Sequence, residues 1–205
     1  MNYFITGTDT DIGKTLVSSW LCLHTNYAYF KPIQTGSIHN TDSQTVANLA
    51  GVKIYPESYL FKDPVSPHLA SQRTNTQIDL LDIKLPQKSN LIIEGAGGLL
   101  TPINKQHSMI DLIKQTQAYV ILVCSSRVGT INHTLLSLEA LRARSISNVG
   151  VIMSGNVNMD NIQAIEYYGN VNILGLLPLL NSINNRALLN YPLPQKLNEL
   201  LGEKK

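Results

Sequence analysis

Near its N-terminus the chain reads Gly7-Thr8-Asp9-Thr10-Asp11-Ile12-Gly13-Lys14-Thr15, between an apolar run at 3–5 and a stretch that favours a helix. A glycine-bounded loop at a helix start points several backbone N–H groups at one place, where the helix dipole also favours negative charge. Lys14 would then reach the β- and γ-phosphates of a nucleotide, and the Thr15 hydroxyl would contact Mg²⁺. The segment therefore predicts a phosphate-binding loop.

This segment is a variant of the pattern G-x-x-x-x-G-K-[ST], because the pattern places glycine at position 8 and this chain has Thr8. An ordinary strand-turn-helix corner that contains Gly-Lys-Thr is the alternative interpretation. The strand before the loop and the helix after it are the context that the motif requires, so they favour the phosphate-binding loop.

The composition predicts a single P-loop domain over residues 1–205, with 43% hydrophobic and 15% charged residues. A net charge of +2 from 16 basic and 14 acidic residues spread along the chain gives no basic face for nucleic acid or an anionic membrane.

Cys22 and Cys124 form neither a C-x-x-C motif nor a disulfide framework. The five histidines have no spacing that suggests zinc. With no leader pattern and no apolar run near ~20 residues, we expect a cytoplasmic protein outside the membrane.

Short apolar runs alternate with helix-length segments along the whole chain. This alternation predicts an α/β fold of the P-loop NTPase type, with a mostly parallel sheet covered by helices on both faces. Strands are predicted at 3–6, 27–32, 91–94, 119–124, 149–153 and 173–176. Helices are predicted at 14–24, 42–50, 67–72, 78–83, 109–115, 130–144 and 160–168.

Two parts of the chain give weaker signals. Residues 52–88 are rich in Pro, Ser and Asp, a composition typical of lids and substrate loops. The C-terminal part carries an apolar stripe of leucines. A membrane-surface helix would have a richly basic face and aromatic anchors, so we expect this stripe to pack against the body of the protein. The stripe consists of Leu193, Leu197, Leu200 and Leu201.

Further candidate residues follow two predicted strands. Lys31 and Thr35 lie at the carboxyl end of the 27–32 strand, where Pro32 and Gly36 end the extended run. Asp42 lies at the start of the next predicted helix. These positions would present polar groups at the edge of a parallel sheet.

Glu94 ends a continuous apolar strand, which resembles a Walker B position that binds Mg²⁺ directly or through water. A solvated acid at a strand end is the alternative interpretation. The segment 95–98 that follows has three glycines in four residues, which indicates a close approach of the backbone to another group.

Gly129 and Thr130 begin another predicted helix, whose free N–H groups could bind a carboxylate or phosphate.

Taken together, these motifs resemble dethiobiotin synthetases, the family that catalyses the penultimate step of biotin synthesis. The resemblance covers about residues 1–180. The phosphate-binding loop alone is shared with many proteins, but its combination with the Lys31 segment and the glycine-rich acid segment is specific. The segments that carry it are 7–15, 31–36, Asp42, 66–68, 94–98 and 129–133.

The resemblance implies an ATP- and Mg²⁺-dependent cyclo-ligase that converts 7,8-diaminopelargonic acid and CO₂ into dethiobiotin. One amine takes up CO₂ as a carbamate, the γ-phosphoryl group passes to the carbamate, and the second amine closes a urea ring as phosphate leaves. Lys14 and Lys31 would neutralise the developing charge. Thr15, Asp42 and Glu94 would hold Mg²⁺ with hard oxygen ligands.

The resemblance also implies further binding residues and a homodimer with active sites at the subunit interface. The partner's helix start would hold the substrate's carboxylate tail. Substrate contacts are expected at Thr10, Thr35, Thr130, Ile131 and Asn132. Nucleotide contacts are expected at Asp11, Ile12, Gly13, Lys14, Thr15, Leu16, Glu94, Gly95, Ala96, Gly97, Ser154, Asn156, Pro178, Leu179 and Leu180.

One position departs from the family pattern. Where the family usually has an Asn that pairs with adenine, this chain has Ser154, followed two residues later by Asn156. A hydroxyl makes one adaptable hydrogen bond, whereas an amide can donate and accept at once. Ser154 therefore predicts weak base selectivity, unless Asn156 takes over the pairing.

A regulatory P-loop ATPase of the partitioning or septum-placement type is the competing hypothesis. Such proteins use a nucleotide as a dimerisation switch, usually have a second lysine early in the loop, and often have a basic membrane helix. This chain has Thr8 and Asp9 in the loop and a mixed-charge C-terminal tail over 196–205. A related amidoligase would require an additional glutaminase domain, which 205 residues cannot hold.

Overall fold

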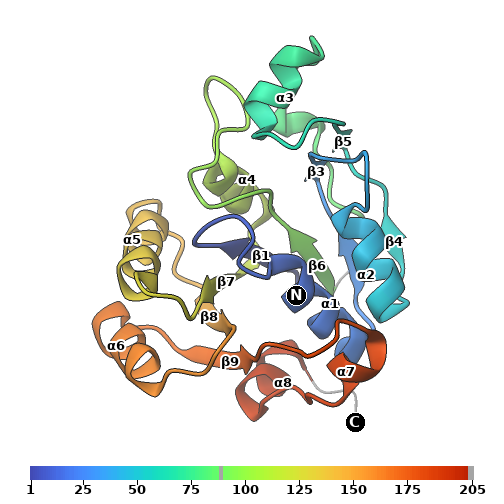
Figure 1. Cartoon of the computed structure of the whole chain (residues 1–205). Coiled ribbons are helices and arrows are strands. Elements are labelled where there is room, and N and C mark those ends of the chain that lie inside the picture. The colour runs from blue at the N-terminus through green and yellow to red at the C-terminus, as the bar shows by residue number, and fades with distance from the viewer. Residues whose placement is uncertain (88–89, 203–205) are drawn as a thin grey trace.

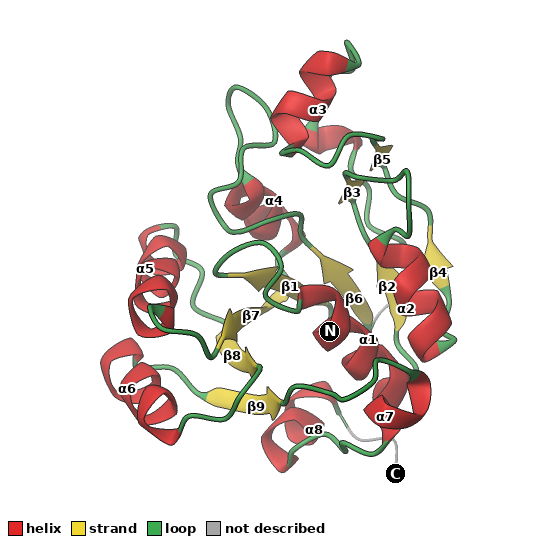
Figure 2. Ribbon diagram, viewed as in Figure 1, coloured by secondary structure: helices red, strands yellow, loops and turns green. Residues whose placement is uncertain are grey.

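The computed structural model describes residues 1–87 and 90–202, and its main element is a seven-stranded sheet in the order β4-β2-β6-β1-β7-β8-β9 (Figure 2). Each neighbouring pair in this sheet is parallel. Residue 88 of the irregular segment and the last three residues of the charged tail lie outside the described residues. The strands are β1 (Tyr3–Gly7), β2 (Ala28–Phe30), β4 (Ile54–Tyr55), β6 (Leu91–Glu94), β7 (Tyr119–Ser125), β8 (Val149–Ser154) and β9 (Ile173–Leu177).

Helices cover both faces of the sheet, as predicted (Figure 1). One face packs against α1 (Lys14–Thr25), α2 (Asp42–Ala50), α7 (Asn185–Leu189) and α8 (Gln195–Leu201). The other face packs against α4 (Met109–Thr116), α5 (Thr130–Ala143) and α6 (Met159–Gly169), whereas α3 (Pro67–Arg73) lies beyond the end of the main sheet and adds Ala70 to the same core. The α/β class of the P-loop type is confirmed.

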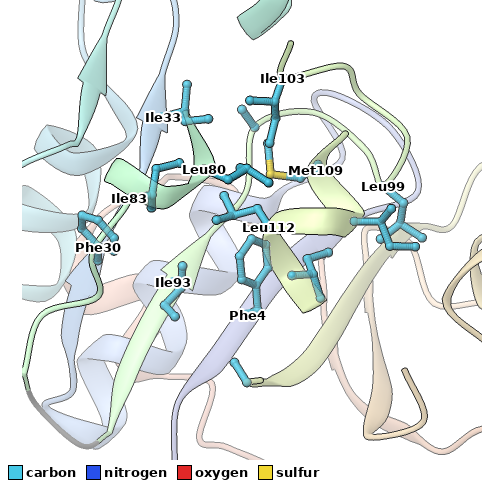
Figure 3. Packing of buried hydrophobic residues seen from close by; sticks show 14 of the residues in the cluster. Phe4, Phe30, Ile33, Leu80, Ile83, Ile93, Leu99, Ile103, Met109 and Leu112 are labelled. Atoms are coloured by element: carbon cyan, nitrogen blue, oxygen red, sulfur yellow. The ribbon is translucent and has the colours of Figure 1, made fainter. Parts of the chain in front are cut away.

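The strands are mostly apolar, with polar residues chiefly near their carboxyl ends, because both faces of the sheet are buried. Along β1, Tyr3 and Ile5 contribute to the core beneath α1, whereas Phe4 points to the opposite core. Figure 3 shows Phe4 beside Leu112 of α4 in that second core. The alternation of side chains along each strand therefore fills two cores from one continuous apolar run.

Strand order brings the candidate residues together at one edge. β6 lies between β1 and β2, with Ile5 opposite Glu94 and Phe30 opposite Ile93. The phosphate-binding loop follows β1, Glu94 is the last residue of β6, and Lys31 comes directly after β2. Parallel strands present their carboxyl ends on one side of a sheet, so three separate segments meet there.

The prediction of one strand over 27–32 was wrong in its extent. The strand β2 ends at Phe30, and Ile33–Gln34 forms a separate short strand, β3, which pairs with β5 (Tyr59–Leu60). Pro32 has no N–H to donate, and its carbonyl accepts from the backbone N–H groups of Ser58 and Tyr59 instead. The chain therefore leaves the main sheet at Lys31.

The interval 52–88 has more structure than predicted. β4 and β5 lie in it, and the expected helix at 78–83 is only a 3₁₀ turn, η1 (Leu80–Asp82). The Asp79 side chain accepts from the Leu81 N–H at 2.9 Å, which starts the turn. Ile83 is buried directly after it, so the chain turns back to the core without a longer helix. The helix α7, capped by Asn184, was also not predicted.

The C-terminal leucines pack against the body of the protein, as expected. Leu193, Leu197 and Leu201 are buried in the same core as α1, and Leu200 is packed against it. The hydroxyl of Tyr3 in β1 donates to the Leu200 carbonyl at 2.8 Å. Within residues 1–87 and 90–202, no helix combines the length and apolar character that crossing a membrane would require.

We expect the Leu197→Ala substitution to lower the free energy of unfolding by about 2–5 kcal/mol, because it removes a fully buried side chain from the core beneath α1. Lys196→Ala is the matched control on the exposed face of α8, where a surface ion pair contributes only about 0–1 kcal/mol. Urea unfolding of both variants measures the difference. Equal loss in the two variants would contradict the packing of α8.

Candidate active site

The phosphate-binding loop has positive φ angles at two residues, and no side chain caps the start of α1. Gly13 is the N-cap residue with φ 95°, and Asp11 also has a positive φ, of 54°. A Cβ on Gly13 would lie 2.6 Å from the Ser154 hydroxyl oxygen. Because no side chain caps this helix, its first N–H groups are available to an anion at the end where the dipole is favourable.

Lys14 lies under the loop with 7% of its surface exposed. Its ammonium donates to the Asp9 carbonyl at 2.8 Å, so the loop folds over its own lysine. Burial lowers the pKa of Lys14 below its ordinary value, and the nearby Glu94 carboxylate offsets only part of this shift.

A buried ionic cluster lies next to the loop. The Lys31 ammonium is 2.6 Å from Asp42 Oδ2 and 3.3 Å from Glu94 Oε1, and it also donates to the Gly95 carbonyl at 3.1 Å. Burial alone would lower the pKa of Lys31, but the two carboxylates raise it above its ordinary value. Burial would raise the pKa of Asp42, yet Lys31 holds it below its usual range. Lys31 is therefore a fixed cation.

Three hard oxygen donors converge beside this lysine. Thr15 Oγ1 lies 2.9 Å from Asp42 Oδ1 and 2.8 Å from Glu94 Oε1. Oxygen donors of this kind fit Mg²⁺, which is usually bound by one or two carboxylates and keeps several waters or phosphate oxygens. Among the described residues, no group of three or more His, Cys, Asp or Glu side chains could hold a metal. The fit therefore rests on two carboxylates and one hydroxyl.

Sequence reasoning missed three supporting residues. Ser18 and Tyr29 donate to Glu94 Oε2 at 2.7 and 3.0 Å. Gln34 Oε1 accepts from the Asp42 N–H at 3.0 Å and so fixes the start of α2. Sequence spacing could have indicated Ser18 and Tyr29. Ser18 is three residues after Thr15 on one helix, and Tyr29 is two residues before Lys31, so each has a spacing that places it on the same side as a predicted site residue.

A cavity of about 820 Å³ opens over the loop and the ionic cluster. It contains most of the expected loop residues, both lysines, Thr10 and Thr35. Residues 64–67, from the interval whose composition is typical of lids and substrate loops, form a further wall. The lining residues are Thr10, Asp11, Gly13, Lys14, Thr15, Leu16, Lys31, Gln34, Thr35, Gly36, Asn40, Asp42, Pro64, Val65, Ser66, Pro67, Glu94, Ala96, Gly97, Thr101 and Pro102.

Several expected binding residues lie outside this lining in the described part of the chain. Ile12 packs against the core beneath α1, and Gly95 presents its carbonyl to Lys31. Ser154 ends β8 with its hydroxyl near Gly13, and Asn156 is exposed in the loop beyond it. Pro178, Leu179 and Leu180 follow β9 in sequence, and Thr130, Ile131 and Asn132 begin α5.

Comparison with known proteins places the chain in a family. A family described as "AAA domain" matches residues 1–187. The chain is 54% identical over 200 residues to the ATP-dependent dethiobiotin synthetase BioD of Lawsonia intracellularis, which covers 98% of each chain. It is 44% identical to the protein of the same name from Paramagnetospirillum magneticum, over 93% of this chain and 94% of that one. The chain belongs to the dethiobiotin synthetase family.

Solved structures show that this synthetase family member shares its fold with distant ATPases. A putative plasmid partition protein from Borrelia burgdorferi bound to AMPPNP matches with a TM-score of 0.57 at 12% identity, over 98% of this chain and 97% of that one. A ParA family ATPase from Chlorobium tepidum matches with a TM-score of 0.53 at 12% identity, over 100% and 93%. At this identity the likeness concerns the fold alone.

We expect Gly13→Ala to weaken nucleotide binding by this synthetase family member about tenfold, because a non-glycine residue at this positive φ costs about 1–2 kcal/mol and the new Cβ would meet Ser154. Titration with a fluorescent ATP analogue measures the effect. Gly51→Ala is the control, since Gly51 has φ 64° at the end of α2 with no atom within 4 Å of the added Cβ. Similar affinities for the two variants would refute the role assigned to the loop backbone.

Proposed function

We propose that the chain is an ATP- and Mg²⁺-dependent dethiobiotin synthetase that acts as a single cytoplasmic P-loop domain. The proposal rests on the near full-length likeness to proteins named ATP-dependent dethiobiotin synthetase. The ionic cluster beside the phosphate-binding loop supports it, because the reaction brings two anions together. The substrates would be 7,8-diaminopelargonic acid, CO₂ and ATP.

The reaction would proceed in three steps. One amine attacks CO₂ and loses a proton, which gives a carbamate. A carbamate oxygen then attacks the γ-phosphorus and ADP leaves, so that a carbamic-phosphoric anhydride forms. The second amine finally attacks the carbonyl carbon and loses a proton, phosphate leaves with the C–O bond electrons, and a cyclic urea results. Ring closure is intramolecular, so holding both amines in place supplies much of the acceleration.

Lys14 and Lys31 would stabilise negative charge on different groups. Lys14 extends from the start of α1 under the loop, where it would turn from the Asp9 carbonyl to the β- and γ-phosphates. Lys31 is held by Asp42 and Glu94, and its ammonium would face the carbamate. Preorganised cations of this kind stabilise developing charge without reorganisation during the reaction.

Thr15, Asp42 and Glu94 would hold Mg²⁺ through the three oxygens that converge in the cavity. When bound, the ion would neutralise charge on the phosphate oxygens. Gln34 keeps Asp42 at the first position of α2, where an acid also interacts favourably with the helix dipole. The chain's own contribution is to hold these ligands at fixed positions.

The substrate contacts are proposed to come from two subunits. Thr10 and Thr35 line the cavity and would contact the diamine. Thr130, Ile131 and Asn132 begin α5 outside this lining, which supports a role for the same residues of a second subunit in a homodimer. The helix start would bind the carboxylate tail of the substrate through its N–H groups.

Incubation with 7,8-diaminopelargonic acid, bicarbonate, Mg²⁺ and ATP tests the proposal. We expect mass spectrometry to detect the cyclic urea, with one ADP formed for each product molecule. ATP hydrolysis without any cyclic urea would favour the alternative, a nucleotide-switched ATPase of the partitioning type, with which the chain shares its fold. Size-exclusion chromatography with light scattering tests the homodimer separately.

The Lys14→Ala and Lys31→Ala variants should separate the two roles. Lys14→Ala should weaken ATP binding and turnover together, whereas Lys31→Ala should lower kcat by roughly 10²–10³-fold with a smaller effect on ATP affinity. Steady-state kinetics and equilibrium ATP binding distinguish the two patterns. The unfolding midpoint of each variant controls for loss of the buried ionic cluster. Wild-type turnover in Lys31→Ala would disprove the assignment of this lysine.

Ser154 should give weak selectivity for ATP over GTP and CTP, because a hydroxyl lacks the paired donor and acceptor of an amide. A good bidentate pair contributes about 1–3 kcal/mol of base discrimination, by analogy with base readout elsewhere. The kcat/KM values for ATP and GTP are compared in wild type, Ser154→Asn and Asn156→Ala. Sharper ATP preference in Ser154→Asn supports the prediction, and strong preference lost in Asn156→Ala would show that Asn156 makes the contact.

A further inference from the structure

The two carboxylate oxygens of Glu94 have different partners. Oε1 faces the site, where Thr15 donates to it at 2.8 Å and Lys31 at 3.3 Å. Oε2 accepts from the Ser18 hydroxyl at 2.7 Å and the Tyr29 hydroxyl at 3.0 Å. Each oxygen therefore has two donors, but Thr15 and Lys31, the donors to Oε1, line the cavity, whereas Ser18 and Tyr29, the donors to Oε2, lie outside its lining. Oε1 is thus the oxygen that faces the site.

Both donors to Oε2 are rigidly placed. Ser18 lies on α1 and Tyr29 on β2, and neither side chain is exposed to solvent. Glu94 lies between them on β6 with 1% of its surface exposed. Turning the carboxylate so that both oxygens face the site would break the two hydrogen bonds to Oε2, each of them to a charged group. The chain therefore fixes the carboxylate from behind through two separate elements.

We propose that Ser18 and Tyr29 are positioning residues that restrict Glu94 to coordination through Oε1 alone, and that this restriction makes the cation site selective for Mg²⁺ over Ca²⁺. The inference rests on the proposed function, in which Glu94 is a Mg²⁺ ligand. It adds the reason why this buried acid is held by two hydroxyls that do not face the cavity.

The coordination chemistry of the two ions supplies the selectivity. Mg²⁺ requires near-ideal octahedral geometry at about 2.0–2.1 Å, and single carboxylate oxygens satisfy it. Ca²⁺ takes about 6–8 oxygen ligands at 2.3–2.6 Å and commonly uses both oxygens of one carboxylate. If Glu94 coordinates through Oε1 alone, Ca²⁺ cannot bind both oxygens of this carboxylate. If Oε2 is released, the carboxylate can turn and bind Ca²⁺ through both oxygens.

The test compares cation affinities in Ser18→Ala, Tyr29→Phe and the double variant of the full chain. Mn²⁺ is bound in the presence of a non-hydrolysable ATP analogue and is displaced by Mg²⁺ or Ca²⁺, with free Mn²⁺ followed by electron paramagnetic resonance. We expect the preference for Mg²⁺ over Ca²⁺ to fall about tenfold in the double variant, which corresponds to the energy of about one hydrogen bond to a charged group. The single variants should show smaller falls in the same direction.

Two nearby hydroxyls provide matched controls. The Tyr3 hydroxyl donates to the Leu200 carbonyl at 2.8 Å, and the Ser19 hydroxyl donates to the Thr15 carbonyl at 2.7 Å. Tyr3→Phe and Ser19→Ala therefore remove the same chemical groups from the same core without a bond to Glu94. We expect both controls to keep the wild-type ratio of Mg²⁺ to Ca²⁺ affinity.

The inference is overturned if the ratio of affinities is unchanged in the folded Ser18→Ala and Tyr29→Phe variants, or if Tyr3→Phe changes it equally. It is also overturned if the wild type does not discriminate between the two ions. If the double variant does not fold, the two single variants decide the result. Cyclic urea formation by the wild type together with an unchanged ratio would refute only this inference, whereas absence of the urea would refute the proposed function.

Discussion

The buried ammonium of Lys31 between Asp42 and Glu94 constrains the rest of the structure. A buried ion costs several kcal/mol unless a partner of opposite charge lies close to it, and removal of one partner costs about 3–5 kcal/mol. The three groups come from the end of β2, the start of α2 and the end of β6. These elements must therefore meet at one point, because displacement of any of them would remove a charged partner from the buried Lys31–Glu94 pair or from Lys31. The wall of the cavity is fixed by the same requirement.

The same requirement distinguishes the two lysines of the site. Carboxylates surround Lys31 and raise its pKa above the ordinary value despite burial. The Lys14 ammonium bonds to a neutral carbonyl of its own loop, and burial lowers its pKa. One lysine is thus held by permanent anionic partners, and the other has a partner that a phosphate can replace. These two environments fit a site in which Lys31 stays in place as a fixed cation and Lys14 changes its partner when a nucleotide binds.

Local patterns in the sequence predicted the phosphate-binding loop, the apolar strand that ends at Glu94 and the parallel sheet, because each depends on neighbouring residues. The bonds from Ser18 and Tyr29 to Glu94 join residues 76 and 65 positions apart, so they depend on the packing of α1 against β6 and on the pairing of β2 with β6. The expected strand over 27–32 was too long because Pro32 cannot donate to the ladder. β4 and β5, at two residues each, are too short for a periodic signal.

The fold alone does not specify the chemistry, because the same sheet supports ATPases of other classes. The chemistry depends on the residues of the site, and one wall of the cavity comes from the irregular interval where periodicity gives no signal. This interval is nevertheless ordered by backbone pairing. The N–H of Gly36 donates to the Asp63 carbonyl at 2.9 Å, and the N–H of Phe61 donates to the Gln34 carbonyl at 2.8 Å. These bonds tie residues 34–36 to residues 61–63, which directly precede the lining residues 64–67, so a stretch without periodic sequence contributes a defined wall of the cavity.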